Sequence, residues 1–299
     1  MDFLILGGSG MLGHKIILEM LASGANVGCT LQGSLHAEKY RSIDLFQAVP
    51  TVLENFDAMR VDTSLARIDK YRPATIVNCI GVIKQRATAA EALPSITLNA
   101  LWPHRLAEAA ARWGGRVIHF STDCVFSGGR GGYEESDPSD ATDLYGRTKF
   151  LGELNYPNAI TLRTSIVGRE LFNFQSLLEW FLSMKGSSIR GFRRVMYSGV
   201  TTNYLAMAVR RLASDFPQLS GLFQVAGPVI SKHDLLCEFR RAFDVDVEIE
   251  PEDVTVSDRT INGLRFETTT GMKAPPWPDL ISEMATDPTP YMKWQSRSL

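Results

Sequence analysis

Short runs of β-branched and other apolar residues alternate along the chain with longer segments whose apolar residues recur three and four positions apart. The short runs predict buried strands, and the longer segments predict amphipathic helices. The predicted strands cover residues 3–6, 27–31, 58–61, 75–80, 116–120, 160–167 and 222–226. The predicted helices cover residues 11–23, 65–71, 97–112, 144–154, 174–184 and 202–216. Repeated strand–helix–strand units build an α/β fold with a doubly wound parallel sheet, whose ligand lies beyond the carboxyl ends of the strands.

The regular alternation loosens after Gly168, and prolines interrupt regular structure near the C-terminus. We therefore predict a large α/β domain made of residues 1–168 and about 201–227. A smaller C-terminal lobe is predicted from about 169–200 together with 228–299.

Composition narrows the range of partners. The chain has 299 residues, 31 of them basic and 33 acidic, with no basic block, so neither nucleic acid nor a membrane surface is expected as a partner. No signal peptide and no apolar stretch of membrane-spanning length is recognised, which predicts a cytoplasmic location. The four cysteines have no metal-ligand spacing, so free thiols and no metal site are expected.

A glycine-rich turn follows the first predicted strand and opens the first predicted helix. Gly7, Gly10 and Gly13 fit G-x-x-G-x-x-G, and Gly8 with the last two fits G-x-G-x-x-G. Such glycines let the backbone approach a pyrophosphate, and the helix N-terminus favours its negative charge. The turn predicts a dinucleotide site in the large domain, against the alternative of a turn without a ligand.

The end of the second predicted strand bears on the cofactor. The sequence there reads Cys29–Gln32 and has no acid before Glu38, although a carboxylate that accepts from the ribose 2′-hydroxyl is typical of NAD-binding chains. His36, Lys39 and Arg41 follow and are suited to a 2′-phosphate. NADP(H) is therefore favoured and NAD(H) stays open, as does the alternative that these are ordinary solvated charges.

Three further side chains suggest acid–base chemistry. Tyr145 and Lys149 are four residues apart on a predicted helix, so they share a face on which an ammonium and a bound nicotinamide can stabilise a phenolate. Thr122 ends the predicted strand 116–120, where its hydroxyl can orient a substrate carbonyl. The alternative is that Ser121, Thr122 and Asp123 only cap the turn.

A wider set of motifs accompanies these residues: Asn78, Asn99-Ala100, Ser121–Phe126, Tyr133-x-Glu135-x-Asp137-Pro138, Leu144–Lys149 with Gly152-Glu153, Arg163–Ser165 and Gly221–Gly227. With them the chain resembles the extended short-chain dehydrogenase/reductases, and among these the dTDP-4-dehydrorhamnose reductase (RmlD-like) family. The resemblance extends over residues 1 to about 240. Its most specific part is Ser-Thr-Asp-x-Val-Phe followed by Tyr-Gly-x-x-Lys-x-x-Gly-Glu.

The resemblance implies roles for individual residues. Thr122, Tyr145 and Lys149 would be catalytic, with Lys149 also holding the nicotinamide ribose, and Asp62, at the end of the third strand, would meet the adenine. The implied cofactor contacts are Gly7, Gly10, Met11, Leu12, Gly13, Thr30, Asp62, Cys79, Gly81, Asn99, Lys149, Thr164 and Ser165. The implied substrate contacts are Val82, Asp123, Val125, Asn173 and Arg193.

The reaction implied by the resemblance is NAD(P)H-dependent reduction of a keto group, at C4, of a nucleotide-linked deoxy sugar. A homodimer is the expected assembly. Arg193 with its arginine neighbours, Arg259 and Arg265 are candidates to hold the diphosphate. Ile166–Gly168 stands where relatives often carry an aromatic residue, and residues 78–85 also depart from the pattern, so the identity of the sugar stays open.

Three other functions share this fold. A sugar-nucleotide epimerase would reuse the same three residues with a retained cofactor. A 4,6-dehydratase is disfavoured by the resemblance, because Cys124 stands where dehydratases carry a glutamate. A non-catalytic NADP-binding regulatory subunit, similar to the β subunit of methionine adenosyltransferase, is the alternative outside catalysis.

Overall fold

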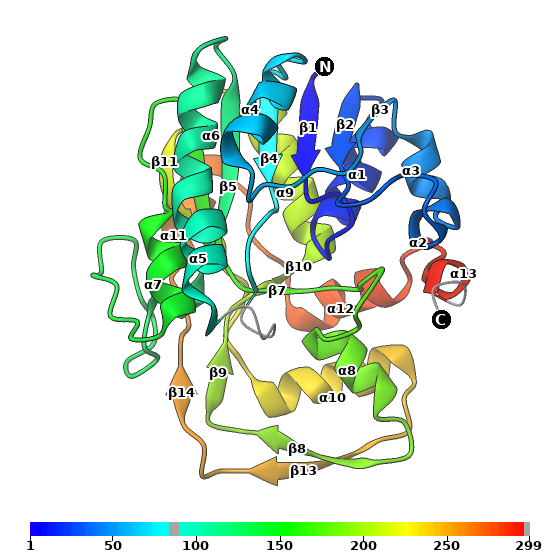
Figure 1. Ribbon diagram of the computed structural model, residues 1–299. Helices are drawn as coiled ribbons and strands as arrows, with labels where there is room; N and C mark the ends of the chain where they lie inside the picture. The colour runs from blue at the N-terminus through cyan, green and yellow to red at the C-terminus, as the bar shows by residue number, and fades with distance from the viewer. Residues whose placement is uncertain (84–89, 296–299) are drawn as a thin grey trace.

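The computed structural model describes residues 1–83 and 90–295. Within these residues, seven strands form one sheet in the order β11-β6-β5-β4-β1-β2-β3, and each pairing in it is parallel (Figure 1). The strands are β1 (Phe3–Leu6), β2 (Val27–Thr30), β3 (Thr51–Leu53), β4 (Thr75–Asn78), β5 (Arg116–Thr122), β6 (Ala159–Thr164) and β11 (Gly221–Gln224). The predicted doubly wound parallel sheet is confirmed.

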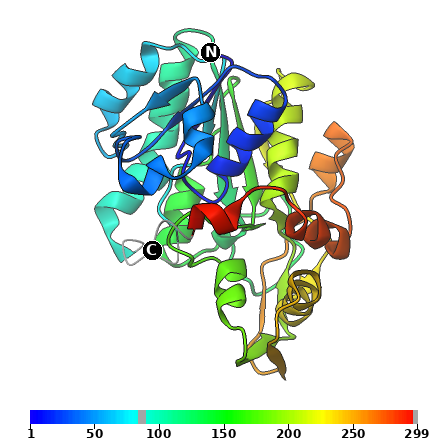
Figure 2. The same ribbon diagram turned by 90° about the vertical axis from the view of Figure 1, so that its right-hand side faces the viewer.

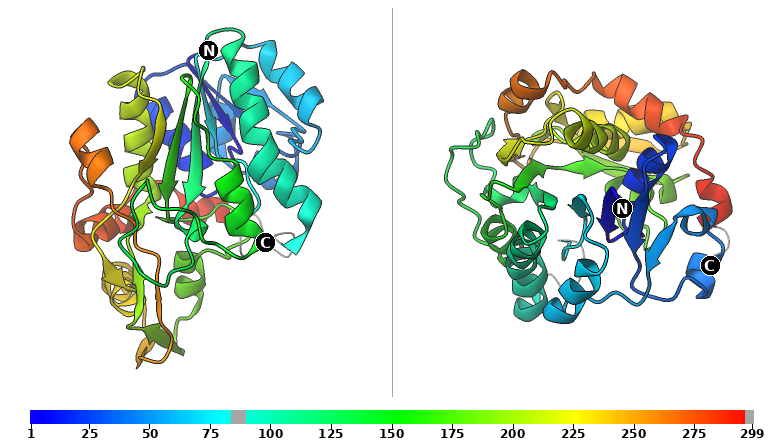
Figure 3. Two further views of the ribbon diagram at one scale, coloured as in Figure 1. Left: turned by 90° about the vertical axis from the view of Figure 1, so that its left-hand side faces the viewer. Right: turned by 90° about the horizontal axis from the view of Figure 1, so that it is seen from above.

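Helices cover both faces of the sheet (Figures 1 and 3). On one face lie α1 (Gly13–Ala22) and α9 (Thr202–Ser214), and on the other lie α4 (Val61–Asp69), α6 (Trp102–Ala111) and α7 (Leu144–Leu151). Successive residues of a strand point to opposite faces. Ile5 accordingly joins the apolar core under α1 and α9, while Leu4 and Leu6 join the core under α4 and α6. This double burial explains the continuous apolar runs of the strands.

The prediction of a third strand at residues 58–61 is wrong. The third strand is β3, and Val61 already belongs to α4. A short apolar run does not distinguish a strand from the buried start of a helix, and Ala58 is buried although it lies outside both elements. Two short helices between β2 and β3, α2 (Glu38–Arg41) and α3 (Asp44–Ala48), were not predicted.

The segment before α6 is also more irregular than predicted. Residues 97–112 were expected to form one helix, but α5 (Ala92–Ser95) and a π-helix, η2 (Ile96–Leu101), precede α6. π-Helical turns within longer helices are often found at functional sites.

A smaller lobe lies beyond the carboxyl ends of the large sheet (Figure 1). Its strands are β8 (Ser188–Phe192), β9 (Val195–Tyr197), β12 (Ile230–Ser231), β13 (Glu248–Glu252) and β14 (Ser257–Asp258), with helices α8 (Leu177–Ser183) and α10 (Lys232–Phe243). β9 lies between β12 and β14, and β8 pairs with β13. The pair β7 (Ile166–Val167) and β10 (Val200–Thr201) lies between the lobe and the sheet (Figure 1).

The C-terminal part of the chain returns to the large sheet. It forms α11 (Leu264–Thr270), α12 (Trp277–Ala285) and α13 (Tyr291–Gln295). α11 packs against β11, α12 contacts both α9 of the large domain and α10 of the small lobe, and α13 lies near α1 (Figure 2). The predicted domain boundaries at residues 168, 201 and 228 stay a prediction. Residues 264–295, which were assigned to the smaller lobe, contact both the large domain and the small lobe. Across the described residues, none of the helices is long and apolar enough to cross a bilayer.

Candidate active site

The glycine turn forms a tight backbone loop between β1 and α1. Gly7 adopts a φ of +78°, and its N–H donates to the Thr30 hydroxyl oxygen at 2.9 Å. A Cβ on Gly13 would stand 2.2 Å from the Gly7 carbonyl oxygen, so only glycine permits this turn. The first N–H groups of a helix have no partner inside the helix. The turn with Met11 and Leu12 at the start of α1 therefore suits a bound diphosphate.

The end of β4 lies beside this turn. A Cβ on Gly7 would be 3.2 Å from the Cys79 carbonyl oxygen, so the two backbones approach closely. Two residues further on, Gly81 leads into Val82, whose backbone N–H donates to the Asn99 side-chain oxygen at 2.8 Å. The predicted cofactor residues Gly7, Cys79 and Gly81 are thus brought together.

The Asn99 side chain, on η2, forms its hydrogen bonds with other residues of the protein. Its side-chain nitrogen donates to the Val82 carbonyl oxygen and to the Thr148 hydroxyl, both at 3.3 Å. Together with the bond from the Val82 N–H, these contacts tie the β4 loop to α7. A direct contact between Asn99 and a cofactor stays a prediction, since both ends of the amide already have protein partners.

Thr122 ends β5 at the carboxyl edge of the sheet, in register with Thr164 of β6. Its hydroxyl donates to the Asp123 carboxylate at 3.1 Å and accepts from the Cys124 backbone N–H at 3.1 Å. These bonds start a short 3₁₀ turn, η3 (Asp123–Val125). The capping role considered as an alternative for Thr122 is therefore present alongside its place at the sheet edge.

α7 brings Tyr145 and Lys149 to the same edge. Asp143 caps the helix by accepting from the Gly146 N–H at 2.7 Å. The Tyr145 phenol lies within hydrogen-bonding reach of Thr122. The Lys149 ammonium donates to the Phe120 carbonyl oxygen of β5 at 2.6 Å. The three residues predicted as catalytic thus converge.

Two glycines allow α7 to lie this close. A Cβ on Gly146 would stand 2.3 Å from the Cys124 carbonyl oxygen, and one on Gly152 would stand 1.9 Å from the Asn99 carbonyl oxygen. Both distances are shorter than a Cβ tolerates, so α7 packs directly against the backbones of η3 and η2. This close packing explains why the Tyr-Gly-x-x-Lys-x-x-Gly motif has glycine at both positions.

Electrostatics at the site follow mainly from burial. Burial raises the pKa of the Tyr145 phenol, and the nearby Cys124 and Asp123 raise it further, while the hydrogen bond with Thr122 lowers it. Burial lowers the pKa of Lys149 to about 8. The expected lowering of the Tyr145 pKa by Lys149 is not found in the protein alone, because desolvation of the phenolate dominates.

A buried ion pair between Arg163 and Glu153 stabilises the strands that carry the site. Arg163 of β6 binds both Glu153 carboxylate oxygens at 2.7 Å, and the Ser121 hydroxyl donates to the same carboxylate at 2.7 Å. Such bidentate pairs fix geometry. The network joins β5, β6 and the residues after α7 directly beneath Thr122.

The predicted adenine contact lies elsewhere than expected. Asp62 does not end the third strand; it lies exposed in the first turn of α4, where it accepts from Arg105 at 2.8 Å. Two acids lie in the loop after β3. Glu54 accepts from the Ser34 hydroxyl and the Leu35 N–H. Asp57 is next to the buried Phe56, whose N–H donates to the Leu31 carbonyl oxygen after β2. The sequence prediction missed Asp57 because it misplaced the strand.

Among the predicted substrate contacts, Val125 is fully buried in a small core with Phe126 and Ile261, so its side chain cannot face a ligand. Arg193 directly follows β8, a strand at the end of the small lobe away from the large sheet (Figure 1), and its guanidinium pairs with Asp253 at 3.5 Å. The structure therefore differs from both predicted substrate contacts. The Val125 side chain packs in a core, and the Arg193 side chain forms an exposed ion pair.

The remaining predicted contacts stay predictions. Asn173, between β7 and α8, has a φ of +70°, and Val82 is buried beside Asn99. Arg259 is closer to the site than Arg193, since it donates to the Phe126 carbonyl oxygen at 3.0 Å and its charge acts on Asp123. Nowhere in residues 1–83 and 90–295 do three or more His, Cys, Asp or Glu residues gather as a metal site.

The structure adds two residues from the smaller lobe that the sequence analysis did not identify. The Lys232 ammonium lies 3.6 Å from the centre of the Tyr197 ring, and its charge acts on Asp123 beside Thr122. Ser231 and Asp234 form a helix-start pattern that locates Lys232 on a helix. No local signal shows that this lysine meets the end of β5.

Comparison with known proteins agrees with the fold. The curated dTDP-4-dehydrorhamnose reductase of Burkholderia thailandensis is 31% identical over 139 residues, which are 46% of this chain and 45% of the relative, so less than half of that protein is matched. Methionine adenosyltransferase 2 subunit beta of Mus musculus is 25% identical over 94% of this chain and 88% of its own. A solved dTDP-4-dehydrorhamnose reductase from Bacillus anthracis, in complex with NADP, has a TM-score of 0.78 at 17% identity, covering 95% of this chain and 99% of that one.

A family match covers most of the chain. Residues 1–262 match the family described as the RmlD substrate binding domain. Since this match covers most of the sequence, the chain belongs to the RmlD substrate binding domain family.

Proposed function

We propose that the protein catalyses the NAD(P)H-dependent reduction of a keto group, at C4, of a nucleotide-linked deoxy sugar. The observation that carries this proposal is the convergence of Thr122, Tyr145 and Lys149 beside a glycine turn with the geometry of a diphosphate cradle. A curated relative named dTDP-4-dehydrorhamnose reductase supports the same reaction class.

Each of the three residues has its own role in the proposed reaction. A bound dihydronicotinamide supplies the hydride that reaches the ketone carbon. Tyr145, protonated at neutral pH because burial raises its pKa, donates a proton to the carbonyl oxygen as that oxygen gains negative charge. Thr122 orients the same oxygen through its hydroxyl. Lys149 is held against β5 by the Phe120 carbonyl oxygen, and its ammonium would hold the cofactor ribose.

The cofactor residues follow from the glycine turn. Gly7, Gly10 and Gly13 would hold the diphosphate, with Cys79 and Gly81 lining its path and Thr164 and Ser165 near the nicotinamide. For the adenine side we propose Asp57 in place of Asp62, because Asp57 lies after β3 beside the chain that leaves β2. NADP(H) is the proposed cofactor, with NAD(H) as the alternative; the Bacillus anthracis structure was solved with NADP.

The proposal is tested with the purified protein, NADPH or NADH, and a panel of dTDP-, UDP-, GDP- and CDP-linked ketosugars. We expect oxidation of NADPH with at least one of them, and tighter binding of NADPH than of NADH. Deuterium carried on C4 of the nicotinamide should appear on the sugar. Cofactor binding without turnover of any sugar would favour a regulatory subunit, and sugar conversion without net oxidation would favour an epimerase.

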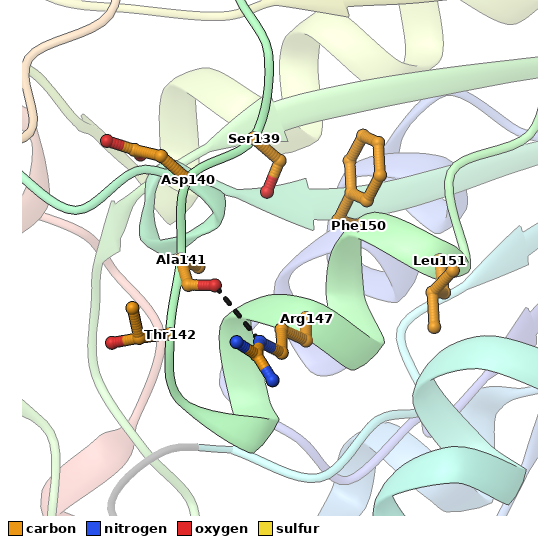
Figure 4. A pocket seen from close by; sticks show the side chains of 7 residues that line it. All are labelled: Ser139, Asp140, Ala141, Thr142, Arg147, Phe150 and Leu151. Atoms are coloured by element: carbon orange, nitrogen blue, oxygen red, sulfur yellow. Dashed lines mark hydrogen bonds between the residues drawn. The ribbon is translucent and has the colours of Figure 1, made fainter.

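We also propose that the protein forms a homodimer through the outer surface of α7 and η2. Phe150 and Leu151 are 41% and 61% exposed, and Ile96 and Leu101 of η2 are 47% and 46% exposed. Figure 4 shows the first two beside Arg147, whose guanidinium donates to the Ala141 carbonyl oxygen. Exposed apolar groups of this kind mark interaction surfaces. A cytoplasmic location stays a prediction from the sequence.

A further inference from the structure

Lys232 occupies an unusual place for a lysine. It is the first residue of α10 and follows β12, which pairs with β9 so that Ile230 is opposite Tyr197. Its ammonium lies 3.6 Å from the centre of the Tyr197 ring. The Trp277 ring also packs against Tyr197, at 5.6 Å between ring centres. An aromatic platform therefore holds the lysine side chain in one orientation.

This placement is unfavourable for the fold alone. A cation at the N-terminus of a helix is opposed by the helix dipole. Burial lowers the pKa of Lys232 to about 8, and the charges of Asp123 and Cys124 only partly compensate. A half-buried cation with a perturbed pKa at a candidate site suggests a function.

Asp123 is the carboxylate whose charge acts on Lys232. It follows Thr122 directly, it is buried, and one of its oxygens accepts from the Thr122 hydroxyl. Its charge also acts on Tyr145, so Lys232 and Asp123 belong to the region that contains the proton donor. The small lobe thus contributes a cation, and the large domain an anion, next to the groups that would hold the keto oxygen.

We propose that Lys232 is a substrate-binding residue that, with Asp123, selects a sugar carrying an oxygen substituent next to the reacting keto carbon. The ammonium donates to that oxygen, and the Asp123 carboxylate accepts from a hydroxyl on the same side of the ring. The inference rests on the proposed reductase function, because it places the keto oxygen at Thr122 and Tyr145. Lys232 transfers no proton in this assignment.

Two variants test the role, Lys232→Met, which removes the charge, and Lys232→Arg, which keeps it. Lys185→Met is the control, since Lys185 is exposed on the same lobe. Loss of a hydrogen bond from a charged group predicts that KM for the ketosugar rises about 10- to 100-fold in Lys232→Met, with a smaller change in kcat. Lys232→Arg should retain part of the affinity, and the control should match the wild type.

A binding measurement keeps the test independent of turnover. Calorimetry with dTDP-glucose and with dTDP alone should show that Lys232→Met weakens only the sugar-bearing ligand, while the affinity for NADPH stays unchanged. Equal weakening of both nucleotides, a parallel loss of NADPH affinity, or an unchanged KM would overturn the assignment. If the wild type binds dTDP-glucose but reduces no ketosugar, the reductase proposal fails while the role of Lys232 in sugar binding is still measured.

Discussion

The Tyr145 phenol lies in an environment that keeps it protonated. Burial and the neighbouring acidic groups raise its pKa, and the Lys149 ammonium is held by a backbone carbonyl of β5. Reduction of a ketone requires a donor that carries its proton at neutral pH, and Tyr145 meets this requirement, although the raised pKa makes the phenol a weaker acid than a free tyrosine. The same residue in an epimerase would have to give and take the proton in turn.

Tyr145→Phe is expected to lower kcat about 10²- to 10⁴-fold, the usual contribution of one positioned proton donor, and to leave the dissociation constant of NADPH unchanged. The ring and its packing remain, and only the hydroxyl is lost. Turnover and cofactor binding are measured separately on the same preparation. Tyr71→Phe, at a tyrosine that is 43% exposed, is the control. Unchanged turnover in Tyr145→Phe would show that another group supplies the proton.

At the scale of elements, the position of α7 decides whether the site exists. Its two ends touch the backbones of η3 and η2 at glycines, and the Asn99 amide ties the β4 loop to the same helix. The site is therefore built by close contact between elements that belong to different crossovers of the sheet.

Gly152→Ala should displace α7, because the new methyl group would stand 1.9 Å from the Asn99 carbonyl oxygen. Overpacking of this kind typically costs about 1–3 kcal/mol in the free energy of unfolding, and the shift of Lys149 should also lower kcat. Gly129→Ala is the matched control, since the nearest atom to its Cβ is 3.8 Å away. Both variants are compared by denaturant unfolding and turnover. Equal stability of the two would contradict the close contact.

The His14 imidazole connects α13, near the C-terminus, to the glycine turn through two hydrogen bonds. The Gly10 carbonyl oxygen accepts from Nδ1 at 2.8 Å, so Nε2 accepts from the Tyr291 hydroxyl at 2.8 Å. Lys15 also pairs with Asp287 in the same segment. Residues near opposite ends of the chain thus stabilise one turn.

This contact predicts a pH dependence of stability. Burial lowers the pKa of His14 from 6.5 to about 4. As the pH falls, the unfolded chain binds this proton first, so the contribution is complete above about pH 6.5 and is lost progressively down to about pH 4. It amounts to about 3 kcal/mol at 1.36 kcal/mol per pKa unit.

The test is the pH dependence of the unfolding free energy in the wild type and in His14→Gln. The gap between them should narrow as the pH falls from about 6.5 to about 4, while His36→Gln, at an exposed histidine, should follow the wild type. A gap that stays constant over this range would mean that His14 is not buried in its neutral form.

At the scale of the whole molecule, the outer face of α7 and η2 predicts the oligomeric state. We expect a homodimer in solution and a monomer for Leu151→Glu, because a charge replaces a side chain that is 61% exposed. Met292→Glu, at a residue that is 80% exposed on α13, should remain dimeric. Sedimentation velocity at several concentrations distinguishes the species. A monomeric wild type would contradict the proposal.

Local patterns in the sequence determined much of this protein. The alternation of strands and helices predicted the parallel sheet, and the glycine spacing located the turn after β1. Helical spacing placed Tyr145 and Lys149 on one face, and the end of an apolar strand placed Thr122. These inferences depend on period and spacing within one or two elements, which neighbouring residues decide.

Other features depend on the path of the chain, which only the tertiary structure decides. Glu54 and Asp57, and not Asp62, lie in the loop after the third strand, because β3 is too short to be recognised by its pattern. Val125 is buried in a core whose partners are distant in sequence. The charge of Lys232 acts on Asp123 only because the small lobe lies beyond the carboxyl edge of the sheet. Contacts between such distant segments arise from packing and have no periodic signal in the sequence.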